Sequence, residues 1–388
     1  MRVAMEGSFL TLPPSGTGTY LRSLTHALRE ADPSLDLRLL MPNWEDPESL
    51  SSRSENALLH RLRRDRRFRR ASWELLGVAS AARAERPDLL HIPHFSAPLR
   101  VGCPLVITIH DVIPLVLPAY RASRPMRLHL AAVRRTVRAA RLVLTPSHAA
   151  AADVKRALGI PPERIRVTPE AAGPAYRPGD NPGHVGEVVR RFGVTGRYVF
   201  NVGGFDVRKN LPVLLEAFAR VRTRLDESLQ LVIAGAPHSD NPAVFPSLAP
   251  VIQRLGIERA VILPGRISEE EKVALYQGAA LYATPSLYEG FGLTALEAMA
   301  CGVPTVAANR TSLPEVVGDG GLLVEPDAEA FAAAMFDILT NPARALELSA
   351  NGMARAAAFT WQRTAQLTLA AYREVVAAES ATTRERID

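Results

Sequence analysis

Residues 280–304 read ALYATPSLYEGFGLTALEAMACGVP, and this stretch decides the fold. It opens with a short apolar run that is typical of a buried strand, and two closely spaced glycines then interrupt it. We predict that a helix begins near Leu293 and ends before Gly302 and Pro304, a combination that stops helices. The order strand, glycine-rich turn, helix leaves unpaired amides at the helix N-terminus, and such amides favour an anion such as a diphosphate.

Short apolar runs separated by helical stretches recur on both sides of this segment. MRVAME (1–6) and PLVITIH (104–110) lie in the first half of the chain, and YVFNV (198–202) and LQLVIAG (229–235) lie in the second. Because these runs are apolar throughout rather than alternating, they predict parallel sheets that are covered by helices on both faces. The predicted fold class is therefore α/β.

The 388-residue chain is longer than one core comfortably organises, which indicates two domains. Residues 173–183, GPAYRPGDNPG, are rich in glycine and proline and are the best candidate for a linker. We predict two Rossmann-like, doubly wound domains over residues 1–175 and 176–360. Ligands of such sheets bind outside the carboxyl ends of the strands, so we expect the site in the cleft between two facing domains.

Composition limits the cellular context and the partners. Apolar residues make up 47% and charged residues 22% of the chain, which is typical of a globular protein, and no apolar run approaches the ~20 residues that span a bilayer. The first residues lack the features of a signal peptide, and the two cysteines, Cys103 and Cys301, are far apart. We therefore expect a cytoplasmic protein without a disulfide framework or a zinc site. The net charge of +6 favours an anionic partner without naming it.

A second candidate for anion binding follows the run YVFNV. Gly203 and Gly204 allow the backbone to approach a ligand closely, and Arg208 and Lys209 offer positive charge ahead of a predicted helix. Of the 46 lysines and arginines only three are lysines, so an arginine-rich chain has kept lysine at this position. The alternative is a tight turn with solvated cations.

Two carboxylates accompany the glycine-rich turn of residues 289–292. Glu289 opens it, and Glu297 lies about one turn inside the predicted helix. Carboxylates accept hydrogen bonds from hydroxyls, which suits a polyol such as a sugar ring or a ribose. Glu289 and Glu297 could also be the two catalytic carboxylates of a glycosidase. That function would not explain the two glycine-bearing loops that favour a diphosphate. The structural alternative is a capping carboxylate together with a surface glutamate.

Polar residues also follow strands in the first half of the chain. His110 and Asp111 end an otherwise apolar strand. Either the pair points into the cleft, or His110 is a core histidine whose ring nitrogens are hydrogen-bonded within the protein. His91 and His94 end another strand near the same edge, and a metal cluster with His110 is an alternative. No obvious carboxylate set or cysteine accompanies these histidines, so we expect no metal.

These motifs together resemble the family-4 glycosyltransferases of the GT-B fold, and the similarity spans essentially the whole chain. It rests on the loop SGTGTY (15–20), HDVIP (110–114), TPS (145–147), VGGFDVRKN (202–210) and, most specifically, EGFGLTALEAMACGVPTVAAN (289–309). The resemblance implies a retaining glycosyltransferase with front-face attack, a nucleotide-diphosphate sugar as co-substrate, and neither metal nor cofactor. It also implies that a closing helix, over residues 361–380, crosses back to the first domain.

The resemblance further implies roles for individual residues. Glu289 is expected to contact hydroxyls of the donor sugar and Glu297 the ribose, while Arg208 and Lys209 hold the diphosphate. His110 is expected to contact the transferred sugar, so that His110 and Glu289 are the catalytic candidates. The other donor-binding candidates are Gly16, Gly18, Gly203, Gly204, Arg266 in the loop that borders the nucleobase, Gly290, and the amides of Phe291, Gly292, Leu293 and Thr294.

One departure from the family pattern concerns the donor. Many relatives carry arginine directly after the first loop glycine, where this chain has Gly204, and this leaves Arg208 and Lys209 with more of the diphosphate charge. The form HDVIPLVLP resembles mannosyltransferase-like members. The expected hexosyl donor is GDP-mannose or a UDP-sugar, and the expected acceptor is a glycan or a lipid-linked molecule.

Two basic segments, residues 60–70 and 121–141, raise the question of a further, anionic partner. They either contact an anionic membrane surface or form a solvated arginine-rich face. Two other functions stay as alternatives, a nucleotide-sugar epimerase of the same fold and a non-catalytic nucleic-acid binder. Aromatic residues, which would stack on bases, make up only 6% of the chain, so we expect no nucleic-acid partner.

Overall fold

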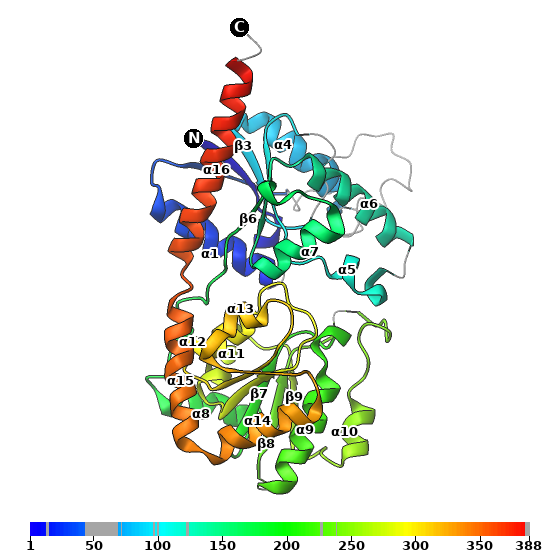
Figure 1. Cartoon of the computed structure of the whole chain (residues 1–388), viewed down its shortest axis with the longest axis vertical. Helices are drawn as coiled ribbons and strands as arrows, with labels where there is room; N and C mark the ends of the chain where they lie inside the picture. The colour runs from blue at the N-terminus through cyan, green and yellow to red at the C-terminus, as the bar shows by residue number, and fades with distance from the viewer. Residues whose placement is uncertain are drawn as a thin grey trace, which may run out of the picture.

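The computed structural model describes residues 1–12, 15–42, 69–70, 72–95, 98, 101–121, 124–225, 228–237 and 239–384. Two α/β units lie one above the other along the long axis of the molecule (Figure 1). Each contains a six-stranded sheet in which neighbouring strands run parallel. The prediction of an α/β fold with two Rossmann-like sheets is therefore confirmed.

The first unit is built on the strand order β2-β1-β3-β4-β5-β6. Both faces of its sheet are covered: Ala4 joins one buried cluster with Ile107, whereas Val3 and Met5 join a second cluster on the other face. This explains why the strands are apolar throughout. The strands are β1 (Arg2–Glu6), β2 (Asp36–Leu40), β3 (Leu89–Ile92), β4 (Leu105–Thr108), β5 (Leu142–Thr145) and β6 (Ile165–Val167), and the helices include α1 (Gly16–Ala31), α4 (Val78–Glu85), α5 (Ile113–Val116), α6 (Arg124–Ala139) and α7 (His148–Leu158).

The second unit has the strand order β12-β11-β10-β7-β8-β9. Because β7 and β10 are hydrogen-bonded neighbours at its centre, the loops that follow them meet at one edge of the sheet. The strands are β7 (Tyr198–Val202), β8 (Gln230–Ala234), β9 (Val261–Gly265), β10 (Leu281–Thr284), β11 (Thr305–Ala308) and β12 (Leu322–Val324), and the helices are α8 (Pro182–Arg191), α9 (Leu211–Arg224), α10 (Ala249–Leu255), α11 (Glu269–Gln277), α12 (Leu293–Ala300), α13 (Leu313–Val317), α14 (Ala328–Thr340) and α15 (Pro342–Ala357) among the described residues.

The last helix, α16 (Trp361–Arg384), returns from the second unit and packs on the first (Figure 1). Leu369 and Tyr372 are buried against Leu21 and Leu24 of α1. The hydroxyl of Tyr372 also lies 2.6 Å from Nδ1 of His91 at the end of β3. The closing helix thus completes the core of the first unit. In the described part of the chain, no helix combines the length and the apolar character that crossing a bilayer requires.

Candidate active site

The loop after β7 is shaped by glycine. Gly203 has φ 154°, and Gly235, at the end of the neighbouring β8, has φ 130°. A Cβ atom at Gly235 would lie 1.8 Å from the carbonyl oxygen of Gly203, so the two backbones approach more closely than any side chain allows. The short turn that follows, Val207–Lys209, reaches the loop after β10, where Lys209 bonds to Glu289.

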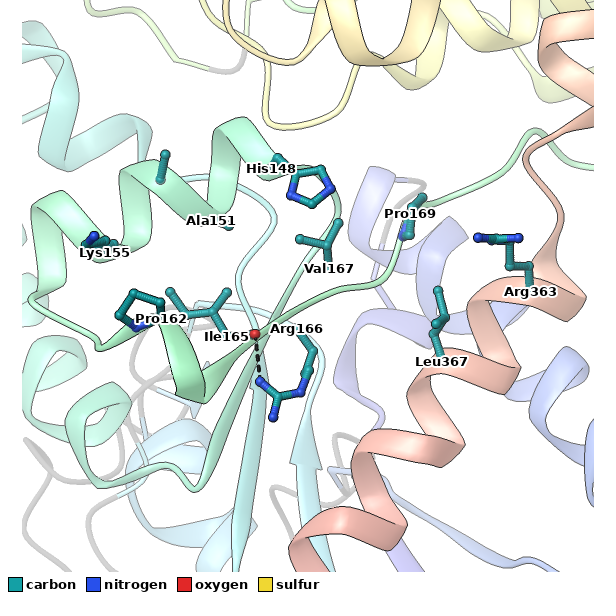
Figure 2. Close-up of a pocket in the computed structure, with 11 residues that line it drawn as sticks. His148, Ala151, Lys155, Pro162, Ile165, Arg166, Val167, Pro169, Arg363 and Leu367 are labelled. Atoms are coloured by element: carbon teal, nitrogen blue, oxygen red, sulfur yellow. Dashed lines mark hydrogen bonds between the residues drawn. The ribbon is translucent and has the colours of Figure 1, made fainter.

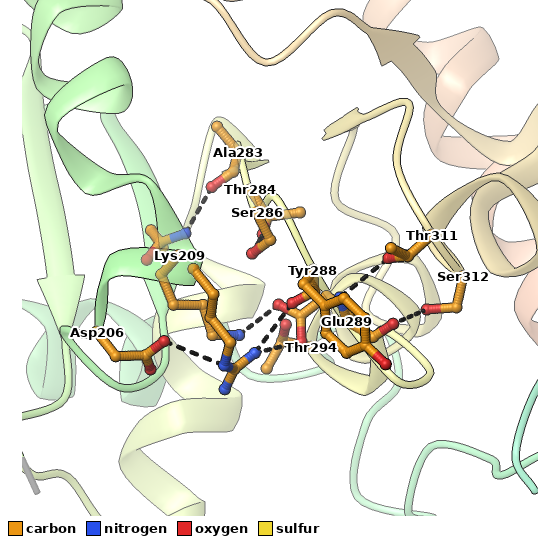
Figure 3. Close-up of polar contacts among 12 residues, drawn as sticks. Asp206, Lys209, Ala283, Thr284, Ser286, Tyr288, Glu289, Thr294, Thr311 and Ser312 are labelled. Carbon is orange, nitrogen blue, oxygen red and sulfur yellow. Dashed lines mark hydrogen bonds and ion pairs between the residues drawn. The ribbon is translucent and has the colours of Figure 1, made fainter. Parts of the chain in front are cut away.

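Arg208 and Lys209 both bond to the carboxylate of Glu289. Figure 3 shows Lys209 directed at Glu289. Lys209 Nζ donates to Glu289 Oε1 at 2.5 Å, and Arg208 Nη1 donates to Glu289 Oε2 at 2.8 Å. Arg208 Nε also lies 3.1 Å from Oδ1 of Asp206. The side chains of the two cations and Glu289 are at most 18% exposed. The two loops singled out in the sequence therefore meet in one buried ionic cluster of Asp206, Arg208, Lys209 and Glu289.

The ionisation of Glu289 follows from its two partners. Burial alone would raise its pKa, but Lys209 and Arg208 outweigh that effect and lower the pKa to about 2. Burial lowers the pKa of Lys209, and Glu289 opposes this shift. Counted as charged groups, the two cations balance Asp206 and Glu289, so the cluster is close to neutral.

Two residues that the sequence analysis missed hold the backbone of Glu289. Its amide donates to Thr311 Oγ1 at 3.0 Å, and its carbonyl accepts from Ser312 Oγ at 2.9 Å (Figure 3). Thr311 has φ 48°, an unusual conformation for a residue other than glycine. Neither residue type signals this role, because serine and threonine are common in loops; only the fold brings them to Glu289.

The predicted helix after the glycine-rich turn is α12, which begins at Leu293 and ends at Ala300, as the sequence indicates. Its N-cap residue is Gly292, with φ 107°, and no side chain of the described residues caps this end. The amides of Ala295 and Leu296 bond to the carbonyl of Gly292. The earlier amides, at Leu293 and Thr294, are the ones that a helix leaves for an anion.

Glu297 lies deep inside the second unit and is only 2% exposed. Lys272 Nζ donates to its Oε1 at 3.2 Å, and the Tyr276 hydroxyl donates to its Oε2 at 3.1 Å. Burial raises the pKa of Glu297. In this structure Glu297 therefore bonds to α11 rather than standing open to a ligand.

His110 follows β4 on the side of the first unit that faces these loops. Its Nδ1 lies 2.8 Å from Glu170 Oε1, and its Nε2 lies 3.1 Å from the carbonyl oxygen of Pro93. The ring of Tyr20 packs against it with a centroid distance of 4.6 Å. Burial alone would lower the pKa of His110, but Glu170 outweighs this and raises it. Glu170 is a third residue that the sequence analysis missed, although it lies only a few residues after β6.

The first and second units touch at the two catalytic candidates. A Cβ atom at Gly290 would lie 2.0 Å from the carbonyl oxygen of His110, so only glycine lets the loop after β10 come this close. Ser147 Oγ donates to the carbonyl of Gly290 at 2.6 Å. The segments that carry His110 and Glu289 therefore lie on either side of one contact between the units.

Three side chains extend this contact. The Tyr120 hydroxyl donates to Asp206 Oδ1 at 2.5 Å, which ties the first unit to the ionic cluster. The Tyr288 hydroxyl donates to Asp153 Oδ2 at 2.8 Å. Glu315 accepts hydrogen bonds from the first amides of α7, where a carboxylate is favoured by the helix dipole.

The remaining candidates lie at the edges of this region or away from it. Gly16 and Gly18 form the start of α1, where the Gly18 amide donates to Ser15 Oγ at 3.2 Å as an N-cap. Arg266 is exposed directly after β9. The histidines of the alternative metal cluster have separate partners: His91 Nε2 lies 2.8 Å from Thr108 Oγ1, and His94 Nε2 lies 2.8 Å from Glu6 Oε2. Within the described ranges no group of three or more histidine, cysteine or acidic residues is arranged to hold a metal ion.

Two doubly wound units whose strand ends face each other define the GT-B architecture, and comparisons with known proteins agree. The family model for glycosyl transferases group 1 matches residues 189–355, and the model for glycosyltransferase family 4 matches residues 14–172. The O-antigen chain mannosyltransferase B of Escherichia coli is 28% identical over 392 residues, which cover 96% of this chain and 100% of that protein. The MMP alpha-(1->4)-mannosyltransferase of Mycolicibacterium hassiacum is 33% identical over 294 residues, which cover 72% of this chain and 67% of that protein.

Solved structures share the fold at low sequence identity. The crystal structure of Anabaena Alr3699/HepE in complex with UDP-glucose superposes with a TM-score of 0.70 and 18% identity, over 96% of this chain and 100% of that chain. The family matches and the shared fold lead to one conclusion. The chain belongs to the family-4 glycosyltransferases of the GT-B fold.

Proposed function

We propose that this chain transfers mannose from a nucleotide-diphosphate donor, with retention of anomeric configuration and without a metal, to a glycan or lipid-linked acceptor in the cleft. The observation that carries the proposal is the buried contact of Arg208 and Lys209 with Glu289, directly across from His110. Both relatives described above are named as mannosyltransferases, which supports mannose as the sugar. GDP-mannose is the first donor to test and UDP-sugars are the second.

A donor diphosphate would compete with Glu289 for the two cations. Arg208 and Lys209 lie in a site with little water, where their interaction with phosphate is stronger than at the surface. As they turn to the diphosphate, the Glu289 carboxylate becomes free to accept hydrogen bonds from sugar hydroxyls. The open amides at the start of α12 add donors for the charge that develops on the leaving diphosphate.

The expected role of Glu289 bears on the stereochemical course. Once the two cations turn to the diphosphate, its carboxylate is free to accept hydrogen bonds from the sugar hydroxyls. We expect Glu289 to bind the sugar in this way rather than to form a covalent intermediate. Attack by the acceptor from the face that the diphosphate leaves would then give retention.

The basic face of α6 supports an anionic partner for the first unit. Arg127, Arg134 and Arg138 are exposed along one side of the helix, whereas Val133 and Val137 are buried on the other. A cavity of about 730 Å³ lies along these arginines and reaches Leu115 of α5, next to the HDVIP segment. Residues 60–68 of the other basic segment lie outside the described residues, as do residues 122 and 123.

We propose that this face contacts an anionic leaflet and so brings a lipid-linked acceptor to the cleft. Flotation with vesicles that contain anionic phospholipid tests this part. We expect binding at low salt that high salt removes, and Arg134→Glu combined with Arg138→Glu should abolish it. Equal flotation of the wild type with neutral and anionic vesicles would contradict the proposal.

The function itself is tested by nucleotide binding followed by transfer. Purified protein is heated with GDP, UDP, ADP and their sugars, and a ligand that binds the folded state raises the melting temperature. The stabilising donor is then incubated with mannan-type and lipid-linked acceptors, and the anomer of the product is read by NMR. Conversion of the donor sugar without any acceptor would favour an epimerase, and the absence of stabilisation by every nucleotide would contradict the proposal.

A further inference from the structure

Glu170 lies on the segment that leaves the first unit after β6, and this segment is anchored. The Thr168 amide donates to the carbonyl of Thr145 at 2.8 Å, which extends the pairing of β5 and β6. Thr364 Oγ1 of α16 donates to the carbonyl of Pro169 at 2.5 Å. Figure 2 shows Pro169 between the end of β6 and the start of α16. Glu170, which is 7% exposed, therefore directly follows two residues that are anchored to β5 and α16.

The partners of His110 determine where its protons are. Its Nε2 lies 3.1 Å from the carbonyl oxygen of Pro93, and a carbonyl only accepts, so Nε2 must carry a hydrogen. Its Nδ1 lies 2.8 Å from Glu170 Oε1, and an ionised carboxylate also only accepts. In either neutral tautomer one ring nitrogen has no hydrogen, and its lone pair would face the lone pair of the Pro93 carbonyl oxygen or of the ionised Glu170 carboxylate.

The remaining choice is whether the shared proton belongs to His110 or to Glu170. The hydrogen bond to Glu170 and the negative charge of its carboxylate raise the pKa of His110 against the effect of burial, which favours the proton on the ring. The neighbouring His91 shows the contrast: burial lowers its pKa to about 3, and it is bonded to hydroxyls instead of a carboxylate.

Other charged groups near the ring do not replace Glu170. Asp111 is adjacent in the chain, but burial raises its pKa, and its Oδ1 accepts from the Ile113 amide at 3.1 Å. From the second unit, the backbone of Gly290 packs against the His110 carbonyl. The titratable groups around the ring are Tyr20 of α1, His91 of β3, Asp111 and Glu170, together with Arg208 and Glu289 of the second unit, which interact with Asp111.

We propose that Glu170 is a positioning residue for the transfer reaction, which keeps His110 doubly protonated and fixes the direction of its Nε2–H. This inference rests on the proposed function for the identity of the ligand, but not for the protonation state. In the complex, an oxygen of the nucleotide-sugar donor beside the Pro93 carbonyl would accept from the same Nε2–H, so the ring keeps its direction. A hydrogen bond from a charged N–H group is roughly twice as strong as one from a neutral N–H group. It strengthens further as the oxygens of the nucleotide sugar gain negative charge during the reaction.

The charged form also predicts the sign of the pH dependence. His110 keeps its proton below its raised pKa and loses it as the pH rises through that value, so turnover should fall on the alkaline side. In Glu170→Gln the amide oxygen can still accept from Nδ1–H, which preserves the ring direction, but the negative charge is gone. The variant should therefore lose activity at a lower pH than the wild type.

The direct test is NMR of the full chain with nitrogen-15-labelled histidine, in which His110 is identified by its absence in His110→Gln. We expect wild-type His110 to be doubly protonated at pH 7, and to become neutral at a lower pH in Glu170→Gln than in the wild type. Glu374→Gln is the matched control, because Glu374 pairs with Arg166 at the surface of the same unit and should leave the titration unchanged. This readout needs neither donor nor acceptor.

Kinetics then connect the protonation state to the reaction. With the donor that the thermal-shift screen identifies, kcat of Glu170→Gln should fall roughly tenfold relative to the wild type on the alkaline side and approach it at acidic pH, since each unit of pKa is a factor of ten. A neutral His110 in the wild type at pH 7 would overturn the proposal without any variant. An identical histidine titration in a folded Glu170→Gln protein would also overturn it, whatever the outcome of the donor screen.

Discussion

Replacing Gly290 with alanine should separate the close approach of the two units from folding. In the structure, a Cβ at this position would lie 2.0 Å from the carbonyl oxygen of His110, whereas real Cβ contacts essentially never fall under 3.0 Å. The carbonyl oxygen is a backbone atom and the Cβ is fixed to the backbone, so no rotation of a side chain can relieve the clash. The loop that carries Glu289 must therefore move away from His110 by about 1 Å or more.

A displacement of this size is costly for catalysis, because about 1 Å of misplacement can reduce a rate by roughly 10²-fold. The move also stretches the bond between Ser147 Oγ and the Gly290 carbonyl. We expect kcat/KM of Gly290→Ala to fall about 100-fold, while donor binding to the second unit, measured by thermal shift, changes much less. The cooperative unfolding of the protein should remain.

Gly102→Ala is the matched control for this experiment. Its Cβ would meet nothing within 4 Å, and the residue lies far from the contact between the units. The control should retain wild-type activity. If Gly290→Ala transfers sugar as fast as Gly102→Ala, then close approach of His110 and the Glu289 loop is not required, and the reasoning from the structure is refuted.

Three further predictions address the charges of the site. Lys209→Ala should lower kcat/KM by roughly 10²- to 10³-fold, because the diphosphate loses a cation. Lys155→Ala, on the exposed side of α7, is the control and should not lower it. Equal rates of the two variants in the transfer assay would argue against diphosphate binding by Lys209. The pKa of Glu289 is depressed from 4.5 to about 2, so the carboxylate contributes roughly 3 kcal/mol of stability above pH 4.5 that is lost as the pH falls toward 2. Urea unfolding at pH 5 and pH 3 should show a smaller difference for Glu289→Gln than for the wild type. Prolonged treatment with EDTA should leave the transfer rate unchanged, and a rate that falls and returns on addition of Mg²⁺ or Mn²⁺ would contradict a metal-independent reaction.

Much of this organisation can be predicted from the sequence because it depends on local signals. The apolar strands, the glycines at 203, 290 and 292, and the stop at Gly302 each act within a few residues of their own position. Their placement follows from a general rule, that loops at the carboxyl ends of parallel strands gather at one edge. The meeting of Arg208 and Lys209 with Glu289 is a consequence of that rule and of the pairing of β7 with β10.

The unpredicted part depends on contacts between distant segments. Glu170 reaches His110 across 60 residues, and Tyr120 reaches Asp206 across 86. No periodicity or motif marks these residues, since a glutamate after a strand and a tyrosine in a short helical turn are common. Glu289 was expected to stand ready for sugar hydroxyls, but in the structure it pairs with the cations, because two buried positive charges require a partner.

The central claim is that Arg208, Lys209 and the start of α12 hold the diphosphate of the sugar donor. The most direct measurement is a crystal structure of the chain with its stabilising nucleotide sugar. The account predicts phosphate oxygens within hydrogen-bond distance of both cations and of the Leu293 and Thr294 amides, with the Glu289 carboxylate turned to the sugar. A bound donor whose phosphates lie elsewhere, with Glu289 still held by Arg208 and Lys209, would contradict it.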